Sequence, residues 1–181
     1  MRREAIPSTP SRGSNLYLVG FMGTGKSSIG RELARSLGYR FLDSDAWIEE
    51  REGRTVREIF AAEGEEYFRE READFVREHP REGCVVACGG GLVTRPGRLA
   101  ALEEKGVVVA LYASPETIHQ RTSRNRNRPL LQVENPLARI RELLAEREPF
   151  YREVPLGVST EGRSFGEVVE AVRRIYRSAR T

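Results

Sequence analysis

GFMGTGKS, residues 20–27, is the stretch of sequence that decides how this chain folds. It follows the apolar run 16–19 and precedes a segment in which apolar residues recur at helical spacing up to Gly38. Strand, glycine loop and helix in that order are the context in which the pattern G-x-x-x-x-G-K-[ST] forms a phosphate-binding loop. Its backbone N–H groups face an anion, and the N-terminus of the following helix adds partial positive charge. We therefore expect the loop to bind a nucleoside triphosphate.

Two side chains of this loop have expected roles in phosphate chemistry. Lys26 would reach the β- and γ-phosphates, and the Ser27 hydroxyl would bind Mg²⁺. A purely structural interpretation, in which Gly23 and Gly25 form a turn and Ser27 caps a helix, leaves the lysine without a role. Lys26 is also one of only two lysines among thirty basic residues, so a lysine here is an exception to the use of arginine elsewhere.

Further apolar runs predict the rest of a sheet. Continuous rather than alternating apolarity in these runs indicates strands covered on both faces, as in a parallel sheet between two layers of helices. We therefore predict a three-layer α/β/α fold. The predicted strands are 16–19, 41–42, 84–88, 107–112 and 157–160. The predicted helical segments are one that follows the glycine loop and runs up to Gly38, 47–79 with breaks at Gly53 and Gly64, one after Pro96, one ending near Arg121, 136–152 and 165–178.

Asp43 and Asp45 are two of only three aspartates in the chain, and they end a predicted strand. In extended geometry two side chains this far apart leave the backbone on the same face. Carboxylates beside a phosphate site suggest a divalent cation or a hydroxyl-bearing substrate. The alternative is an Asx turn that caps a helix before Trp47, and the sequence leaves it open.

Gly89, Gly90 and Gly91 follow another predicted strand. Their missing side chains would allow close approach of backbone to a ligand, but a flexible turn is an equally good interpretation from spacing alone. An anionic substrate would require a two-pronged arginine clamp, for which Arg69, Arg128 and Arg147 are candidates in an arginine-rich chain.

Composition limits the remaining possibilities. At 181 residues the chain has room for one domain, with 39% hydrophobic and 31% charged residues. Its longest apolar run, 107–113, is much shorter than the ~18 residues of a membrane-spanning helix. Cys84 and Cys88 lie roughly 13 Å apart if the strand is extended, too far for a disulfide between them, so we expect two buried thiols and a reducing compartment.

Two segments lack a periodic pattern. Residues 1–14 contain no apolar stretch of the kind found in a secretory signal, and we expect a disordered tail before a single domain at 15–181. Residues 123–135 are polar and basic, which is typical of a mobile loop or lid. The net charge of +3 mildly favours anionic partners, but Arg173, Arg174, Arg177 and Arg180 also suit the solvated face of a last amphipathic helix, the interpretation that we favour.

Taken together, these motifs resemble the shikimate kinases, a family of small P-loop phosphotransferases. The similarity extends from about Leu16 to Arg152. It is carried by GFMGTGKSSIGRELA at the phosphate loop, DSD at 43–45, GEEYFRERE at 64–72, GGG at 89–91, RPLL at 128–131 and EREPFY at 146–151. The resemblance implies the nucleoside monophosphate kinase-like fold, with a substrate-binding helical region at about 44–80 and a lid at about 123–135.

The resemblance also implies roles for single residues. Lys26, Asp45 and Arg128 would be catalytic, with Asp45 holding the substrate 3-hydroxyl and assisting its deprotonation and Arg128 reaching the transferring phosphate. Ser27 and Asp43, the latter through water, would hold Mg²⁺. ATP would contact Gly23, Thr24, Gly25, Lys26, Ser27, Ser28, Arg121 and Arg128, with Arg121 against the adenine, and shikimate would contact Asp45, Arg69, Gly89, Gly90, Gly91 and Arg147.

The expected function is therefore ATP-dependent phosphorylation of shikimate with Mg²⁺, by a cytoplasmic monomer without nucleic-acid or membrane partners. One alternative is a kinase for another small hydroxy acid, such as gluconate. A second is a P-loop module that binds a nucleotide without catalysis, although this would not explain the candidate arginines. Nucleic-acid binding through the basic residues is the weakest alternative, and it predicts a steep dependence on salt.

Overall fold

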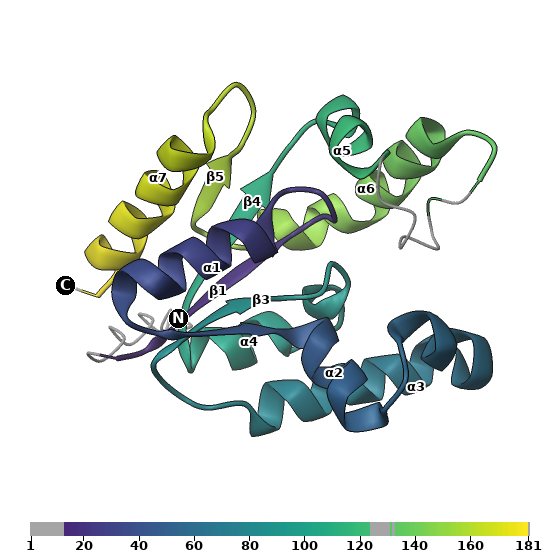
Figure 1. Ribbon diagram of the computed structural model, residues 1–181, viewed down its shortest axis with the longest axis horizontal. Helices are drawn as coiled ribbons and strands as arrows, with labels where there is room; N and C mark the ends of the chain where they lie inside the picture. Colours follow the sequence, from purple (N-terminus) through teal and green to yellow (C-terminus); the bar gives the residue numbers. More distant parts are fainter. Residues whose placement is uncertain (1–12, 124–130, 132, 181) are drawn as a thin grey trace, which may run out of the picture.

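Five parallel strands in the order β2-β3-β1-β4-β5 form a sheet with helices on both faces (Figure 1). The computed structural model describes residues 13–123, 131 and 133–180. The predicted three-layer α/β/α architecture is confirmed. In chain order the elements are β1 (Asn15–Gly20), α1 (Lys26–Leu37), β2 (Arg40–Asp43), α2 (Ser44–Glu52), α3 (Val56–Glu78), β3 (Cys84–Ala87), a 3₁₀ turn η1 (Leu92–Thr94), α4 (Arg98–Glu103), β4 (Gly106–Tyr112), α5 (Pro115–Thr122), α6 (Pro136–Arg152), β5 (Gly157–Ser159) and α7 (Phe165–Ser178).

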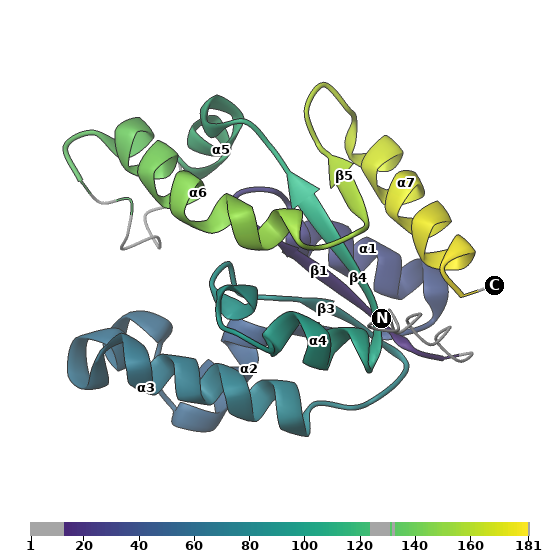
Figure 2. The same ribbon diagram turned by 180° about the vertical axis from the view of Figure 1, so that it is seen from behind.

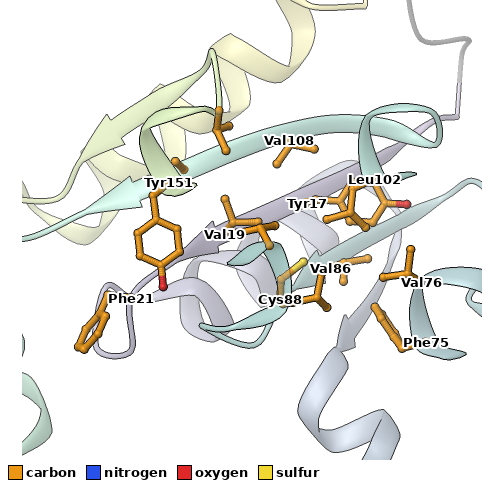
Figure 3. Close-up of a cluster of buried hydrophobic side chains, with 14 of the residues drawn as sticks. Tyr17, Val19, Phe21, Phe75, Val76, Val86, Cys88, Leu102, Val108 and Tyr151 are labelled. Carbon is orange, nitrogen blue, oxygen red and sulfur yellow. The ribbon is translucent and has the colours of Figure 1, made fainter. Parts of the chain in front are cut away.

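Successive residues of β1 contribute to two separate hydrophobic clusters. Leu16 and Leu18 pack into the cluster that α1 and α7 cover. Tyr17 and Val19 pack into the cluster on the opposite face, to which α3, α4 and α6 contribute (Figures 2 and 3). All six residues of β1 are buried, which explains why the run 16–19 is continuously apolar instead of alternating.

The predicted helical stretch 47–79 forms two helices, and both predicted glycine breaks are confirmed. Gly53 ends α2 in the left-handed region at φ 63°, and Gly64 interrupts α3 with φ 84° and ψ −179°. A capping box at Thr55 starts α3: its side chain accepts from the backbone N–H of Glu58, whose carboxylate accepts from the backbone N–H of Thr55. α3 ends before His79, the residue that precedes Pro80.

The carboxyl ends of three neighbouring strands bring the predicted site together. β1 leads into the glycine loop at 20–27, β2 ends at Asp43, and β3 leads into the glycines at 89–91. In open α/β sheets ligands bind outside this edge. The order of the strands therefore places motifs that are far apart in the sequence beside one another.

The cysteines, the last helix and the two segments without a periodic pattern were also the subject of predictions. Cys84 and Cys88 are free and buried, as predicted. α7 buries its apolar face and leaves Arg174 and Arg177 exposed, as the amphipathic interpretation of the last helix predicts, whereas Arg173 and Arg180 are half-buried. Among the described residues, no helix has the length and apolar character needed to span a membrane. Residues 1–12 of the tail predicted at 1–14 and most of the predicted lid, including Arg128, lie outside the described residues. Ser14, the last residue of the predicted tail, is buried and forms an isolated β-bridge with Glu82.

Candidate functional site

The glycine loop curls around the ammonium group of Lys26. Lys26 Nζ donates to the carbonyl oxygens of Gly20, at 2.8 Å, and Phe21, at 2.9 Å. Gly23 and Gly25 have φ values of 80° and 96°, which a residue with a side chain rarely adopts. α1 begins directly after Gly25, so its first N–H groups open onto the loop. The loop therefore has the curvature, the cation and the helix end that an anion requires.

Thr24 and Ser28 differ in what their side chains can contribute. The Thr24 hydroxyl is buried and donates to the Phe21 carbonyl at 2.8 Å, so this side chain braces the loop. The backbone N–H of Thr24 donates to the same carbonyl, at the longer distance of 3.4 Å. Ser28, in the first turn of α1, is exposed and can face a ligand directly.

Asp43 joins the loop to the next strand end. Its Oδ2 accepts a hydrogen bond from Ser27 Oγ at 2.9 Å, while its Oδ1 accepts from the backbone N–H groups of Asp45 and Ala46 at 3.1 and 3.3 Å. The helix-capping interpretation of Asp43 is thus confirmed, since one oxygen caps α2. The other oxygen lies with the Ser27 hydroxyl, and the two are hard oxygen donors of the kind that Mg²⁺ prefers.

The expected geometry of Asp45 was wrong. It does not continue the strand beside Asp43 but lies in the first turn of α2, because Asp43 caps the helix at that point. The helical turn nevertheless places the Asp45 carboxylate against the backbone of Gly89, where a Cβ would overlap Oδ1. Ser44, between the two aspartates, accepts a hydrogen bond from the Gly89 N–H at 2.8 Å. The carboxylate therefore faces the glycine turn.

The turn at Gly89–Gly91 is where the predicted substrate-binding side chains meet. A Cβ on Gly91 would overlap the Arg69 guanidinium, and one on Gly90 would lie 3.4 Å from Arg147 Nη1 and 3.7 Å from the carbonyl oxygen of Gly20. Each glycine thus lies against a different charged group, with Asp45 over the first. Of the two interpretations that the sequence left open, this crowding favours a surface for a ligand over a flexible turn. We call the three glycines at 89–91 the glycine floor. The crowding also places this floor beside the start of the phosphate loop.

Arg69 is held by two carboxylates of its own helix. Its Nη1 donates to Glu72 at 2.8 Å and its Nη2 to Glu65 at 2.7 Å. Glu72 is 1% exposed, and burial raises the pKa of its carboxyl against the lowering effect of Arg69. Glu65 also accepts from Arg69 Nε at 3.1 Å, and its side chain is 56% exposed. The pair with Glu72 is therefore buried, and the pair with Glu65 lies at the surface.

Arg147 and Arg121 approach the loop from opposite ends. The Arg147 guanidinium lies 5.9 Å from the ring centroid of Phe21 as well as over Gly90. Arg121 is exposed and donates to Thr160 Oγ1 at 2.9 Å and to the Gly23 carbonyl at 3.4 Å. Arg147 therefore belongs with Arg69 at the glycine floor, whereas Arg121 lies at the outer side of the phosphate loop.

Three residues that sequence reasoning missed help to build this floor. They are Glu72, Ser44 and Tyr151, the last of which donates from its hydroxyl to the Gly90 carbonyl. Arg69 and Glu72 are three residues apart on one predicted helix, and this spacing could have predicted an ion pair between them. Nothing in the local sequence distinguished Ser44 from an ordinary residue at the start of a helix.

The site is rich in oxygen donors but poor in the side chains that bind metals tightly. Within the described ranges there is no group of three or more His, Cys, Asp or Glu side chains arranged to hold a metal ion. The Ser27 hydroxyl and the Asp43 carboxylate fit a cation that takes its other ligands from phosphate and water, as Mg²⁺ does with nucleotides.

Comparison with known proteins identifies relatives over nearly the whole chain. The family model for shikimate kinase matches residues 22–176. A shikimate kinase of Thermus thermophilus is 50% identical over 173 residues, covering 94% of each chain. A shikimate kinase of Thioalkalivibrio sulfidiphilus is 50% identical over 166 residues, covering 91% of this chain and 87% of the relative.

Solved structures agree with these relatives. A shikimate kinase from Acinetobacter baumannii, in complex with shikimate, superposes with a TM-score of 0.85 at 44% identity, covering 91% of this chain and 93% of that one. A gluconokinase from Sinorhizobium meliloti has a TM-score of 0.58 at 20% identity, covering 93% of this chain and 97% of that one, which indicates a shared fold only.

Proposed function

The chain belongs to the shikimate kinase family, and on that premise we propose that it transfers the γ-phosphoryl group of ATP to the 3-hydroxyl of shikimate, on the route to chorismate and the aromatic amino acids. The products are ADP and 3-phosphoshikimate. The observation that carries the proposal is the convergence of Asp45, Arg69 and Arg147 on the three glycines beside the phosphate loop. This one floor offers a base for a hydroxyl and two guanidinium groups for a carboxylate.

The phosphate loop supplies the binding of ATP. When the triphosphate enters, its oxygens replace the carbonyl partners of Lys26, and the backbone N–H groups of the loop and the start of α1 donate to them. In-line transfer of a phosphoryl group depends on positioning and charge stabilisation, so a covalent nucleophile is not needed. Arg121 would pack against the adenine from the outer side of the loop.

Ser27 and Asp43 would hold Mg²⁺, with Asp43 acting through water. The ion would neutralise charge on the β- and γ-phosphates. The Ser27–Asp43 hydrogen bond supports this assignment because it brings a hydroxyl and a carboxylate oxygen to the mouth of the loop. The backbone N–H bonds to the other oxygen of Asp43 keep the carboxylate in that orientation.

The acceptor would lie on the glycine floor. Arg69 and Arg147 would grip its carboxylate, with Glu65 giving up its place on Arg69 and Glu72 keeping the guanidinium oriented. Asp45 would accept the proton of the 3-hydroxyl as its oxygen bonds to the γ-phosphorus and ADP leaves. Arg128, which lies outside the described residues, would reach the transferring phosphate from the lid and help to exclude water.

We also propose that the protein works as a monomer in the cytoplasm on small molecules alone. One copy of the chain supplies the phosphate loop, the base and both arginines near the floor. The buried free thiols of Cys84 and Cys88 suit a reducing compartment.

The test is release of ADP from MgATP with and without shikimate, with phosphorus NMR to identify the product. We expect release that depends on shikimate, together with one new phosphate monoester per ADP. Gluconate serves as the matched acid, because it carries a carboxylate and hydroxyls on an open chain. Release with gluconate but not with shikimate would overturn the proposal in favour of the alternative hydroxy-acid kinase.

A further inference from the structure

A buried tyrosine at the end of α6 fixes the middle of the glycine floor. Tyr151 is 1% exposed, and its hydroxyl donates to the carbonyl oxygen of Gly90. Its own main-chain carbonyl accepts a hydrogen bond of 2.7 Å from the hydroxyl of Tyr112, at the end of β4. A chain of hydrogen bonds therefore ties β4, α6 and the turn after β3 together.

The phenol oxygen lies at the floor itself and not only in the core. A Cβ on Gly90 would lie 3.7 Å from Tyr151 Oη and 3.4 Å from Arg147 Nη1, so both groups lie over the same glycine. Arg147 and Tyr151 are four residues apart on α6, which puts them on one face of the helix. Figure 3 shows Tyr151 beside Phe21, at the end of the hydrophobic cluster nearest the phosphate loop.

A turn of three glycines needs such an attachment. Glycine has the largest backbone freedom of any residue, so the turn gains no rigidity from its own side chains. Ser44 holds the N–H of Gly89 on one side, and Tyr151 holds the carbonyl of Gly90 on the other. Burial raises the pKa of Tyr151 to about 12, despite the lowering effect of Arg147, so the phenol remains a donor at neutral pH.

We propose that Tyr151 is a positioning residue for the acid substrate: its hydroxyl holds the Gly90 carbonyl and thereby keeps the glycine floor and the Arg147 guanidinium in the geometry that receives the substrate carboxylate. The inference rests on the proposed function, because it assigns Tyr151 to the shikimate side of the site. It predicts that loss of the hydroxyl weakens shikimate binding and leaves ATP binding unaffected.

The decisive variant is Tyr151→Phe, which keeps the ring and removes the hydroxyl. We expect the KM for shikimate to rise roughly five- to tenfold, the loss of one hydrogen bond, with the KM for ATP within about twofold of wild type. Tyr176→Phe is the matched control: Tyr176 is also buried and donates to a main-chain carbonyl, that of Ser14, on the opposite face of the sheet. This variant should lower Tm and leave both KM values unchanged.

The outcomes separate the two proposals. If wild type phosphorylates shikimate and Tyr151→Phe lowers Tm like Tyr176→Phe but keeps the wild-type KM, Tyr151 is only structural and the inference is overturned. If wild type does not turn over shikimate, the proposed function fails and the inference with it. Should Tyr151→Phe not fold, Tyr112→Phe removes the next bond in the chain, and it should raise the shikimate KM roughly two- to threefold. An unchanged KM in that variant would also overturn the inference.

Discussion

Two polar clusters lie at opposite ends of the strands of the sheet, one beside Arg69 and Glu72 of α3 and the other just past the C-terminal end of that helix. The charged cluster comprises Asp45, Arg69, Glu72 and Arg147 around the glycine turn at the carboxyl edge. The neutral cluster comprises Asn15, Tyr17 and His79, where β1 begins and α3 has just ended. The first cluster consists of charged side chains and the second of uncharged ones. The two clusters also differ in how many of their side-chain oxygen and nitrogen atoms have a hydrogen-bond partner.

The neutral cluster satisfies its own hydrogen bonds. Asn15 donates to the Tyr17 hydroxyl at 2.8 Å and to the Pro80 carbonyl at 2.7 Å, and its Oδ1 accepts from the Cys84 N–H at 2.9 Å. Because the Phe75 carbonyl can only accept, His79 Nδ1 carries the hydrogen, and Nε2 accepts from Tyr17. A network that is complete in this way fixes α3 against β1 without a ligand.

The charged cluster is incomplete among the described residues. Glu72 Oε1 is buried there without a hydrogen-bond partner, and so is Nη1 of the neighbouring Arg98, at the start of α4. An unpaired oxygen on a buried carboxylate costs stability, and this one lies beside the glycine turn. The side chains of the neutral cluster, in contrast, bond to one another and join the end of α3 to β1. We therefore expect variants of the two clusters to have opposite phenotypes, with activity lost at the proposed site and stability lost at the neutral cluster.

The largest expected effect is on catalysis at the charged cluster. Asp45→Asn keeps the shape of the side chain and removes the base, so we expect kcat to fall about 10²- to 10⁴-fold. The cap of α2 belongs to Asp43, so the free energy of unfolding should change by less than about 0.5 kcal/mol. Steady-state kinetics and urea unfolding measure the two. A kcat within tenfold of wild type would remove Asp45 from the role of base.

Arg147→Lys should weaken the binding of shikimate more than that of ATP. An ammonium cannot reproduce the two-pronged contact with a carboxylate, and the loss of about 1.5–3 kcal/mol corresponds to roughly ten- to a hundredfold in Kd. Calorimetric titration with each ligand measures the split. Arg152→Lys is the control, because Arg152 lies on the same helix and pairs with Glu148 at the surface. Equal losses for both ligands in Arg147→Lys would contradict the assignment.

Asn15→Ala should have the opposite phenotype to the two variants above. It leaves the Cys84 N–H and the Pro80 carbonyl without their partner, so we expect a loss of about 1–3 kcal/mol in the free energy of unfolding. At temperatures below the unfolding transition, kcat and the KM values for shikimate and ATP should stay at their wild-type levels. The reason is that Asn15 lies at the far end of β1 from the phosphate loop. A rise in the shikimate KM would show that the two edges are coupled.

The contrast between the edges also explains what could be predicted from the sequence. The phosphate loop was predicted residue by residue because its chemistry is local: glycines, one lysine and one serine at fixed spacing. The arginines of the floor were only candidates from the sequence, since nothing near Arg69 or Arg147 distinguishes them from other arginines, and their roles came from the resemblance to a family. Their meeting over Gly90 and Gly91 depends on the order of strands, which no local pattern specifies.

The error at Asp45 has the same origin. The spacing of two from Asp43 was interpreted as strand geometry, but Asp43 ends the strand by capping a helix. The capping bond and the bond to Ser27 coexist at Asp43, because its two oxygens have different partners. The neutral cluster was missed entirely, since Asn15, Tyr17 and His79 are joined only by the packing of α3 on β1.

The smallest predicted effects are on the pH dependence of stability, and they have opposite signs at the two edges. Burial lowers the pKa of His79 from its ordinary 6.5, so below that pH the unfolded chain binds more protons than the folded one. The contribution of His79 is therefore present above pH 6.5 and is lost as pH falls below it. We expect the difference in unfolding free energy between wild type and His79→Gln to shrink between pH 7 and pH 5.

At the other edge, burial raises the pKa of Glu72 above its ordinary 4.5, so just above that pH the folded chain binds more protons than the unfolded one. The contribution of Glu72 is therefore greatest at acid pH and declines as pH rises through the folded pKa. Because Gln does not titrate, the difference in the free energy of unfolding between wild type and Glu72→Gln should fall as pH rises. The corresponding difference for His79→Gln should grow as pH rises. Urea unfolding of the three proteins between pH 4.5 and 8 measures both curves. Slopes of the same sign would mean that Arg69 more than compensates the burial of Glu72, so that the pKa of this carboxyl is lowered and not raised in the folded protein.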